Sequence, residues 1–179
     1  MPSFPTRLDD VWLLDSTRGT LARQTLENEN LFPLWSADES HAVMSYQATG
    51  PPNLHILTLD GNGETTRLLE SEHEQFPTSW SANGRFIAYT DYNPETGPDI
   101  WIVDMEGEAL GTPFQATAFQ ETHGVFSPDG KWLAYVSNET GRKEVYVRSA
   151  SGPGKHLLSV DGGNEPVWAR NGAERRLAG

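Results

Sequence analysis

The feature that most constrains the fold of this chain is an internal repeat with a period of about 45 residues. The segment SWSANGRFIAY begins at residue 79, and the similar segment VFSPDGKWLAY begins 46 residues later, at 125. Two further segments align with them on an aromatic residue, which gives the anchors Trp35, Trp80, Phe126 and Trp168, spaced 45, 46 and 42 apart. A second motif is centred on Trp12, His55, Trp101 and Tyr146, spaced 43, 46 and 45 apart. Two motifs that share one period indicate an array of structural repeats.

Each repeat unit is predicted to form four short strands. In the third unit the runs THGVFS, KWLAYVS, EVYVRS and KHLLSV are separated by the turn-forming segments PDG, NETGRK and ASGPG. Short runs of β-branched and aromatic residues between Gly, Asn, Asp and Pro turns are typical of β-hairpins. Four-stranded units of this length are propeller blades. We therefore expect an all-β chain, a β-propeller with about four blades per chain, in which the four anchor aromatics lie in the core between blades.

The order of the motifs divides the chain into one β-propeller domain, 1–179, with split ends. We expect a half blade at 9–26, complete blades at about 30–71, 75–117 and 121–160, and a second half blade at 164–179. Unpaired edge strands invite pairing with another chain. We therefore expect a homodimer that completes a ring of about eight blades, with a closed monomer as the alternative.

Composition excludes several classes of protein. The chain has 13 basic and 25 acidic residues and a formal net charge of −12, which argues against a nucleic-acid partner. It has no Cys, so disulfide and thiolate chemistry are excluded. We expect no membrane span, because no apolar run approaches the length required. The segment MPSFPTRLDD has no apolar core, so we expect no signal peptide in this chain, and the compartment stays unknown.

The motifs carry a resemblance to a known family. The pattern of an aromatic residue, Ser-x-Asp/Asn-Gly, a basic residue and an apolar-Ala-Tyr run, followed by DIWIVD, resembles the TolB-type (WD-like) β-propeller repeat. More narrowly, segments such as FPTSWSANGRFIAYTDYNPETGPDIWIVDMEG resemble the propeller region that follows the kinase domain of some bacterial serine/threonine protein kinases. The resemblance implies binding of protein segments through one face or the central channel. Such relatives are often extracytoplasmic, and in prolyl oligopeptidases a similar propeller filters substrates for a separate hydrolase domain.

Three departures from the repeat pattern are expected to alter the structure locally. The first unit has SADES where the others have Ser-x-Asp/Asn-Gly, so the turn at Asp38–Glu39 is expected to be longer or strained. His55 takes an aromatic position in the second motif. Arg175 and Arg176 stand where other units have core residues, so the last strand is expected to be frayed, truncated or altered.

No catalytic or metal-binding pattern is present in the sequence. The Gly-x-Ser-x-Gly nucleophile motif, a phosphate-binding loop and the kinase signature residues are all missing, so we expect no enzyme activity and no cofactor. The five histidines have no short spacing typical of metal ligands. The segment DGNGE at 60–64 resembles the start of a calcium loop but lacks the required Gly, and it is interpreted as a turn.

Acidic residues are concentrated in the loops expected on one face of the propeller. These loops together carry a charge of −11, almost the whole net charge. His73 and His123 lie among these acids, at roughly equivalent positions in their blades. Solvated polar loops explain the pattern without a ligand. A functional interpretation is an acidic rim that attracts a cationic peptide, a basic partner or a metal ion. The candidate ligand-binding residues are Glu72, His73, Glu74, Glu121, His123 and Glu165.

Two functions remain open on these observations. The first is a non-catalytic interaction or sensor module that binds a protein or peptide and is detached from, or was once attached to, a kinase or regulator. The second is the accessory propeller of a peptidase, prolyl oligopeptidase-like, whose catalytic domain is absent. A kinase domain encoded beside the propeller favours the first, and an α/β-hydrolase favours the second.

Overall fold

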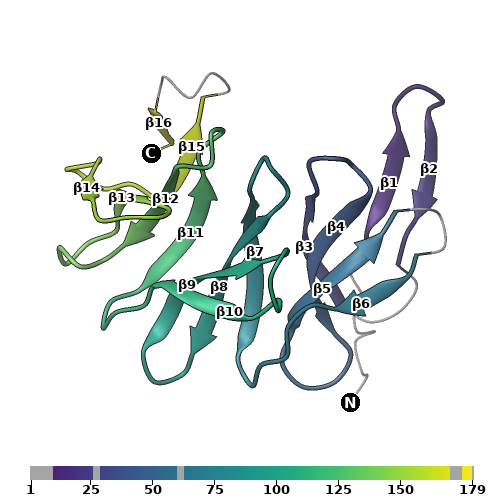
Figure 1. Ribbon diagram of the computed structural model, residues 1–179, viewed down its shortest axis with the longest axis horizontal. Coiled ribbons are helices and arrows are strands. Elements are labelled where there is room, and N and C mark those ends of the chain that lie inside the picture. Colours follow the sequence, from purple (N-terminus) through teal and green to yellow (C-terminus); the bar gives the residue numbers. More distant parts are fainter. Residues whose placement is uncertain (1–9, 26–28, 60–62, 170–174, 179) are drawn as a thin grey trace, which may run out of the picture.

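In the computed structural model the described strands form antiparallel β-sheets, arranged one after another in an arc (Figure 1). The structure describes residues 10–25, 29–59, 63–169 and 175–178. Three sheets have four strands each, ordered β3-β4-β5-β6, β7-β8-β9-β10 and β11-β12-β13-β14. Two-stranded sheets, β1-β2 and β15-β16, flank them. All-β architecture from blade-like units is therefore confirmed.

The strand bounds follow the repeat. The first hairpin is β1 Trp12–Asp15 and β2 Thr20–Arg23. Blade 1 consists of β3 Glu29–Trp35, β4 His41–Gln47, β5 Asn53–Thr58 and β6 Thr65–Arg67. Blade 2 consists of β7 Glu74–Trp80, β8 Phe86–Asn93, β9 Gly97–Asp104 and β10 Gly111–Gln115. Blade 3 consists of β11 Glu121–Phe126, β12 Trp132–Ser137, β13 Glu144–Ser149 and β14 Lys155–Leu157, and the last hairpin is β15 Glu165–Trp168 and β16 Arg175–Ala178.

One hydrogen-bonded turn closes the first hairpin of every blade. In blade 3, Ser127 Oγ donates to Asp129 Oδ1 at 2.6 Å and accepts the backbone N–H of Trp132 at 3.0 Å. The Asp129 carboxylate also accepts the N–H two residues further on, at 3.1 Å. The same bonds recur around two other pairs, Ser36 with Asp38 and Ser81 with Asn83. The repeated Ser-x-Asp/Asn motif is thus a turn-closing device, since its side chains satisfy backbone donors that the hairpin leaves open.

The unusual turn of the first unit has the same length as the others. Glu39 N–H donates to Ser36 O at 3.1 Å, as Gly84 N–H donates to Ser81 O at 2.9 Å. Of the two alternatives expected for this turn, a longer or a strained one, the structure shows the strained one. Glu39 has φ 58°, in the left-handed region where Gly84 has φ 76°. A residue with a Cβ atom is disfavoured in that region, whereas glycine adopts it readily.

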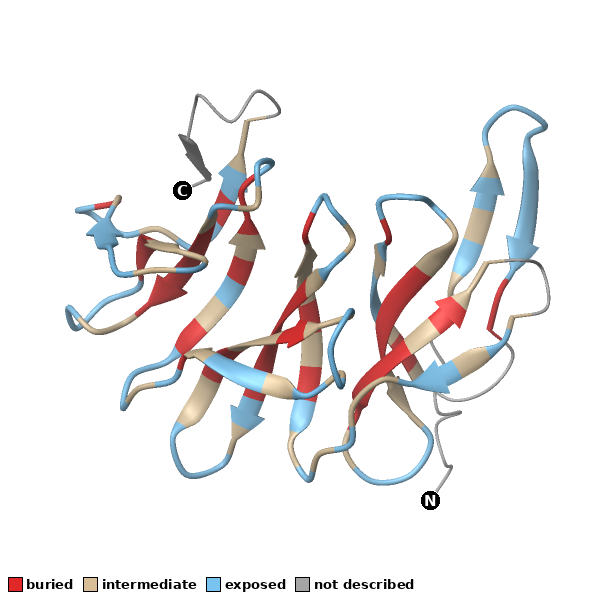
Figure 2. Ribbon diagram, viewed as in Figure 1, coloured by how far each residue is buried: buried red, intermediate tan, exposed pale blue. Residues whose placement is uncertain are grey.

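The core lies between neighbouring blades, and the second and third strands of each blade are the most buried (Figure 2). One apolar cluster joins blades 1 and 2 and includes Val43, Leu54, Ile87, Tyr89 and Val103. A second cluster joins blades 2 and 3 and includes Ala88, Ile100, Phe126, Leu133, Tyr135 and Tyr146. These strands are apolar on both faces because each sheet is covered on both sides by its neighbours.

The anchor aromatics differ in burial. Phe126 is buried, and Trp80 is half-buried against the cluster between blades 1 and 2. Trp168 is half-buried, and its Nε1 donates to the Val125 carbonyl at 2.9 Å. The expectation of a core position was wrong for Trp35, which is 51% exposed. The reason is that β1-β2 contributes only two strands among the described residues, so no inner strand lies in front of Trp35.

His55 occupies an aromatic position, as its place in the motif suggested. Its side chain is buried, and its ring lies 4.6 Å from the ring of Tyr46. Burial lowers the pKa of His55 below its usual value. The imidazole therefore serves as a core ring.

The two terminal hairpins do not pair with each other in the described part of the chain, where they form separate sheets. The last strand, β16, is formed and pairs antiparallel with β15. It has four residues, compared with six to eight in β4, β8 and β12, so it is shorter than its counterparts. The homodimer stays a prediction.

Candidate functional site

The inner strands of the blades share an irregularity that changes which side chains point outward. Regular pairing with the second strand shifts between Leu31 and Leu34 in β3 and between Thr122 and Val125 in β11. A similar shift occurs in β7, after Pro77. Phe32 has φ 55° and His123 has φ 57°, both in the left-handed region. Such bulges interrupt the alternation of a strand and redirect a side chain, and they are frequent beside functional sites.

The redirected side chains line a groove with a volume of about 710 Å³. The groove runs across the inner strands β3, β7, β11 and β15. Four lining residues occupy one repeated position, three residues before the anchor aromatics: Phe32, Pro77, His123 and Glu165. Each inner strand thus contributes the same position to a single continuous surface.

Direct hydrogen bonds between blades hold the groove together. Thr78 Oγ1 donates to the Gly124 carbonyl at 2.8 Å, which ties β7 to β11. The backbone N–H of Phe126 donates to Ser79 Oγ at 3.1 Å, on the same pair of strands. These two bonds fix β7 and β11 relative to one another, so this part of the groove is preorganised for a ligand.

Three of the predicted ligand-binding residues lie in this groove. Glu74, His123 and Glu165 line it, and all three are exposed. Glu74 lies on β7, His123 on β11 and Glu165 on β15. The groove lining contains no Lys or Arg among the described residues. Its charged groups are therefore predominantly acidic.

Glu72 and His73 lie outside the groove lining. Glu72 is exposed. His73 Nδ1 lies 2.7 Å from Asp91 Oδ1, and the Asp91 side chain is buried. His73 precedes β7 whereas His123 lies within β11, so the two histidines do not occupy equivalent positions as expected. The difference arises because His73 belongs to the segment that joins two blades.

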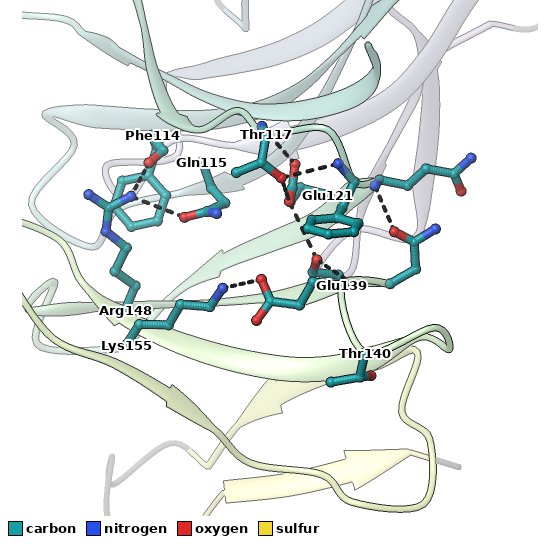
Figure 3. A network of polar contacts seen from close by, with 12 residues as sticks. Phe114, Gln115, Thr117, Glu121, Glu139, Thr140, Arg148 and Lys155 are labelled. Carbon is teal, nitrogen blue, oxygen red and sulfur yellow. Dashed lines mark hydrogen bonds and ion pairs between the residues drawn. The ribbon is translucent and has the colours of Figure 1, made fainter.

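Glu121 is fully buried, and its polar contacts are drawn in Figure 3. Its carboxylate accepts the Thr117 hydroxyl at 2.5 Å and the Thr117 N–H at 3.3 Å. Burial raises the pKa of Glu121 above its usual value, and the nearby Asp99 carboxylate raises it further. Its carboxylate is thus engaged in holding the segment between β10 and β11, and it is not part of an exposed acidic rim.

Buried polar residues recur at one end of every blade. The first strand carries Asn30, Gln75 or Glu121, and the third carries Asn53, Asp99 or Glu144. Asn53 holds the segment between blades 1 and 2, since it accepts the Ser71 N–H at 2.9 Å and donates to the His73 carbonyl at 2.9 Å. Asn53, Glu121 and Glu144 accept hydrogen bonds from N–H groups of the loops, so their polarity has a structural role.

Sequence reasoning missed the aromatic part of the groove. Phe32 and Tyr92 are 60% and 43% exposed, and both flank Phe76. The signal for Phe32 was its place three residues before Trp35, equivalent to that of His123 before Phe126. Nothing in the sequence marked Tyr92, which lies near the end of an otherwise ordinary second strand, β8.

The described residues contain neither a metal site nor a membrane-spanning helix. No group of three or more His, Asp or Glu side chains is arranged to hold a metal ion within residues 10–25, 29–59, 63–169 and 175–178. Over the same ranges, no helix is long and apolar enough to span a membrane. Residues 60–62 of the DGNGE segment lie outside the described residues.

Comparison with known proteins supports the assignment of the repeats. The chain is 31% identical over 119 residues to the Tol-Pal system protein TolB of Anaeromyxobacter dehalogenans, a match that covers 63% of this chain. It superposes on the crystal structure of TolB from Acinetobacter baumannii with a TM-score of 0.77, over 94% of this chain and 42% of that one, at 16% identity. The present chain is a TolB-like β-propeller repeat region.

The likeness has defined limits. The chain spans about a quarter (26%) of the length of the Anaeromyxobacter protein, and no family model matches it. A puromycin-hydrolysing peptidase of Mycobacterium tuberculosis also shares the fold, with a TM-score of 0.69 over 94% of this chain and 33% of that one, at 13% identity. The same fold therefore occurs in proteins of different activity. The likeness to kinase-associated propellers stays a prediction.

Proposed function

We propose that this chain is a non-catalytic β-propeller interaction module that binds a protein or peptide segment in the groove across its inner strands. The observation that carries the proposal is the groove itself, in which one repeated position of each inner strand contributes to a surface of about 710 Å³. The groove combines apolar and aromatic side chains with a few charged ones, the composition expected of a binding site.

The arrangement suits an extended segment better than a compact small molecule. The groove crosses four successive inner strands, and its lining changes from aromatic at β3 and β7 to polar at β11 and β15. Pro33 is exposed and offers a rigid apolar contact that loses no side-chain entropy on binding, whereas Pro77 and Pro166 line the groove but are buried. A peptide with alternating apolar and basic side chains complements such a surface.

The test is selection of binding peptides from a phage-displayed library, followed by binding to two matched variants. Phe32→Arg places a bulky cation in the groove, whereas Leu110→Arg makes the same kind of change at a residue that is 65% exposed and outside the groove lining. We expect selected peptides to bind the original chain and Leu110→Arg but not Phe32→Arg. Selection of no peptide, or equal binding by Phe32→Arg, would contradict the proposal.

A second candidate is the accessory propeller of a peptidase. The observation in its favour is the fold shared with the Mycobacterium tuberculosis peptidase, whose propeller-like part is similar to this chain. Covalent or genetic linkage to an α/β-hydrolase domain would favour this function, and addition of the propeller should then change the hydrolase's preference for substrate length. A hydrolase whose preference is unchanged by the propeller would reject it.

Self-association is the remaining part of the proposal. Strand β1 pairs only with β2 among the described residues, and Trp12, Leu14 and Leu21 on this hairpin are more than half exposed, at 52%, 63% and 61%. An unpaired strand edge beside exposed apolar side chains favours association. Sedimentation of the 179-residue chain should give about twice the 19.8 kDa chain mass, and a monomer at micromolar concentration would contradict the dimer.

A further inference from the structure

Three aromatic rings form a continuous surface at one end of the groove. The ring centroids of Phe32 and Phe76 are 5.5 Å apart at an interplanar angle of 86°, and those of Phe76 and Tyr92 have the same separation and angle. All three residues line the groove, and Phe32 and Tyr92 keep 60% and 43% of their surface exposed. This much accessible aromatic surface in one place is unusual for side chains that serve only to fill a core.

A carboxylate lies on the same surface. Glu74 is the cross-strand partner of Tyr92 and stands two residues before Phe76 on β7. Because side chains two apart on a strand, and direct cross-strand partners, lie on the same face, Glu74 projects beside both rings. Glu74 is exposed and has no ion-pair partner among the described residues.

The chemistry of this end of the groove is selective for one kind of group. Aromatic faces attract cations, and a carboxylate beside them adds a charged hydrogen-bond acceptor. Among the described residues, no Lys or Arg lines the groove. The net charge of −12 makes the surrounding potential negative. A neutral ligand group gains contact with the rings but no charge attraction, and an anionic group is repelled.

We infer that Phe32, Phe76, Tyr92 and Glu74 form a subsite for the guanidinium group of an arginine side chain in the bound peptide. The inference rests on the proposed peptide-binding function and names the residue that the groove recognises. Arginine is favoured over lysine because a planar guanidinium stacks on aromatic rings and pairs with a carboxylate through two parallel N–H donors. An ammonium group is more strongly hydrated and does neither.

The direct test uses the small probe N-acetyl-arginine methylamide, titrated into the isotopically labelled chain and followed by NMR. We expect saturable shifts of the backbone amides of residues 32, 74, 76 and 92. The citrulline counterpart has the same shape without the charge, and we expect it to bind about tenfold more weakly or not at all. Equal binding of the citrulline probe, or of the lysine counterpart, would overturn the guanidinium assignment.

Two variants locate the subsite. Glu74→Gln keeps the size of the side chain but removes its charge, and we expect it to weaken the arginine probe about five- to tenfold. Glu72→Gln is the matched control, since Glu72 is exposed but lies outside the groove lining, and it should leave binding unchanged. If both variants weaken binding equally, the attraction comes from the general negative charge and the subsite is rejected.

The same experiments separate this inference from the proposed function. One outcome is that selected peptides fail to bind Phe32→Arg and yet bind the original chain equally well when their arginine is replaced by citrulline. That result would overturn only the subsite. Selection of no groove-binding peptide would overturn the proposed function itself. Selected peptides that contain arginine and lose affinity with Glu74→Gln would support both.

Discussion

Glu39 adopts the backbone conformation that Gly84 and Gly130 adopt in the other blades, with φ 58° against 76° and 68°. The three turns close through the same Ser and Asp or Asn side chains. The left-handed backbone conformation at this position is therefore a property of the turn, whichever residue occupies it. A glutamate therefore occupies a position whose geometry suits glycine.

Replacing Glu39 by glycine should stabilise the chain. The substitution relieves the left-handed strain of a residue with a Cβ atom, in part offset by the greater flexibility of glycine in the unfolded chain, for a net gain of about 0.5–1 kcal/mol. The midpoint of urea unfolding measures it. Gly84→Ala is the reciprocal control and should lower the midpoint; a lower midpoint for Glu39→Gly would show that the turn is not strained.

The Asp residues of these turns should make the protein sensitive to acid. The Ser36 hydroxyl, followed by the hydroxyl and N–H of Ser40, lowers the pKa of Asp38 to about 2, and Ser127 is the main cause of the lowered pKa of Asp129. Because these values lie below the ordinary 3.8, the stabilisation is present above pH 3.8 and is lost as the pH falls toward the folded-state value.

The second blade supplies the variant that tests this dependence. Asn83 makes the two hydrogen bonds that Asp38 and Asp129 share, to the turn serine and to the N–H two residues further on, without a titrating group. The double variant Asp38→Asn, Asp129→Asn should therefore lose less stability than the original chain when the pH is lowered from neutral to between 4 and 2. Asn83→Asp should have the opposite effect. Thermal unfolding across this pH range is the measurement, and parallel curves for all three proteins would refute the assignment.

Two buried glutamates of blade 3 should respond in opposite ways to neutralisation. Burial, and then the charge of Asp99, raises the pKa of Glu121, whose carboxylate accepts hydrogen bonds from two hydroxyls and one N–H. The Ser159 hydroxyl, with Arg142 and the Gly162 N–H, lowers the pKa of Glu144. Stability from neutral Glu121 is present below pH 4.5 and is lost as the pH rises above it, whereas stability from charged Glu144 is lost as the pH falls below 4.5.

At pH 7, Glu121→Gln should therefore stabilise the chain or leave it unchanged. Among the described residues the buried Asp99 Oδ1 has no hydrogen-bond partner, and a glutamine amide at residue 121 can donate to it. Glu144→Gln should lower stability at the same pH because it weakens three charge-assisted bonds. Urea midpoints at pH 5 and pH 7 distinguish the two; destabilisation of both variants to the same extent at pH 7 would contradict the opposite pKa shifts.

The inter-blade core makes a contrasting prediction for two anchor aromatics. Phe126→Ala should cost about 3–5 kcal/mol, since Phe126 is buried between blades 2 and 3. Trp35→Ala should cost about 1 kcal/mol or less, because half of its surface is already exposed. Equilibrium unfolding of the two variants checks the difference. Similar losses would mean that Trp35 is covered in solution, as the proposed homodimer allows, and the comparison should then be repeated on a monomeric variant.

The sequence by itself determined the architecture, because the features that build a blade are local. Hairpin turns depend on residues within five positions of one another, as in Ser127, Asp129 and Trp132, and strand identity depends on short runs of apolar residues. A local pattern that is repeated at a fixed period is sufficient to predict repeated blades and their approximate bounds.

Only the tertiary structure decided which of the acidic residues face solvent and which aromatic residues are exposed. Glu74 and Glu121 both lie at the first residue of an inner strand, yet one is exposed and the other fully buried. Bulges in the inner strands interrupt the alternation of side chains between the two faces of a strand, which is the pattern used to infer which residues are exposed. Phe32 and Phe76 are 44 residues apart in the chain and meet only because neighbouring blades pack together. Contacts between blades depend on this packing, and no local pattern encodes them.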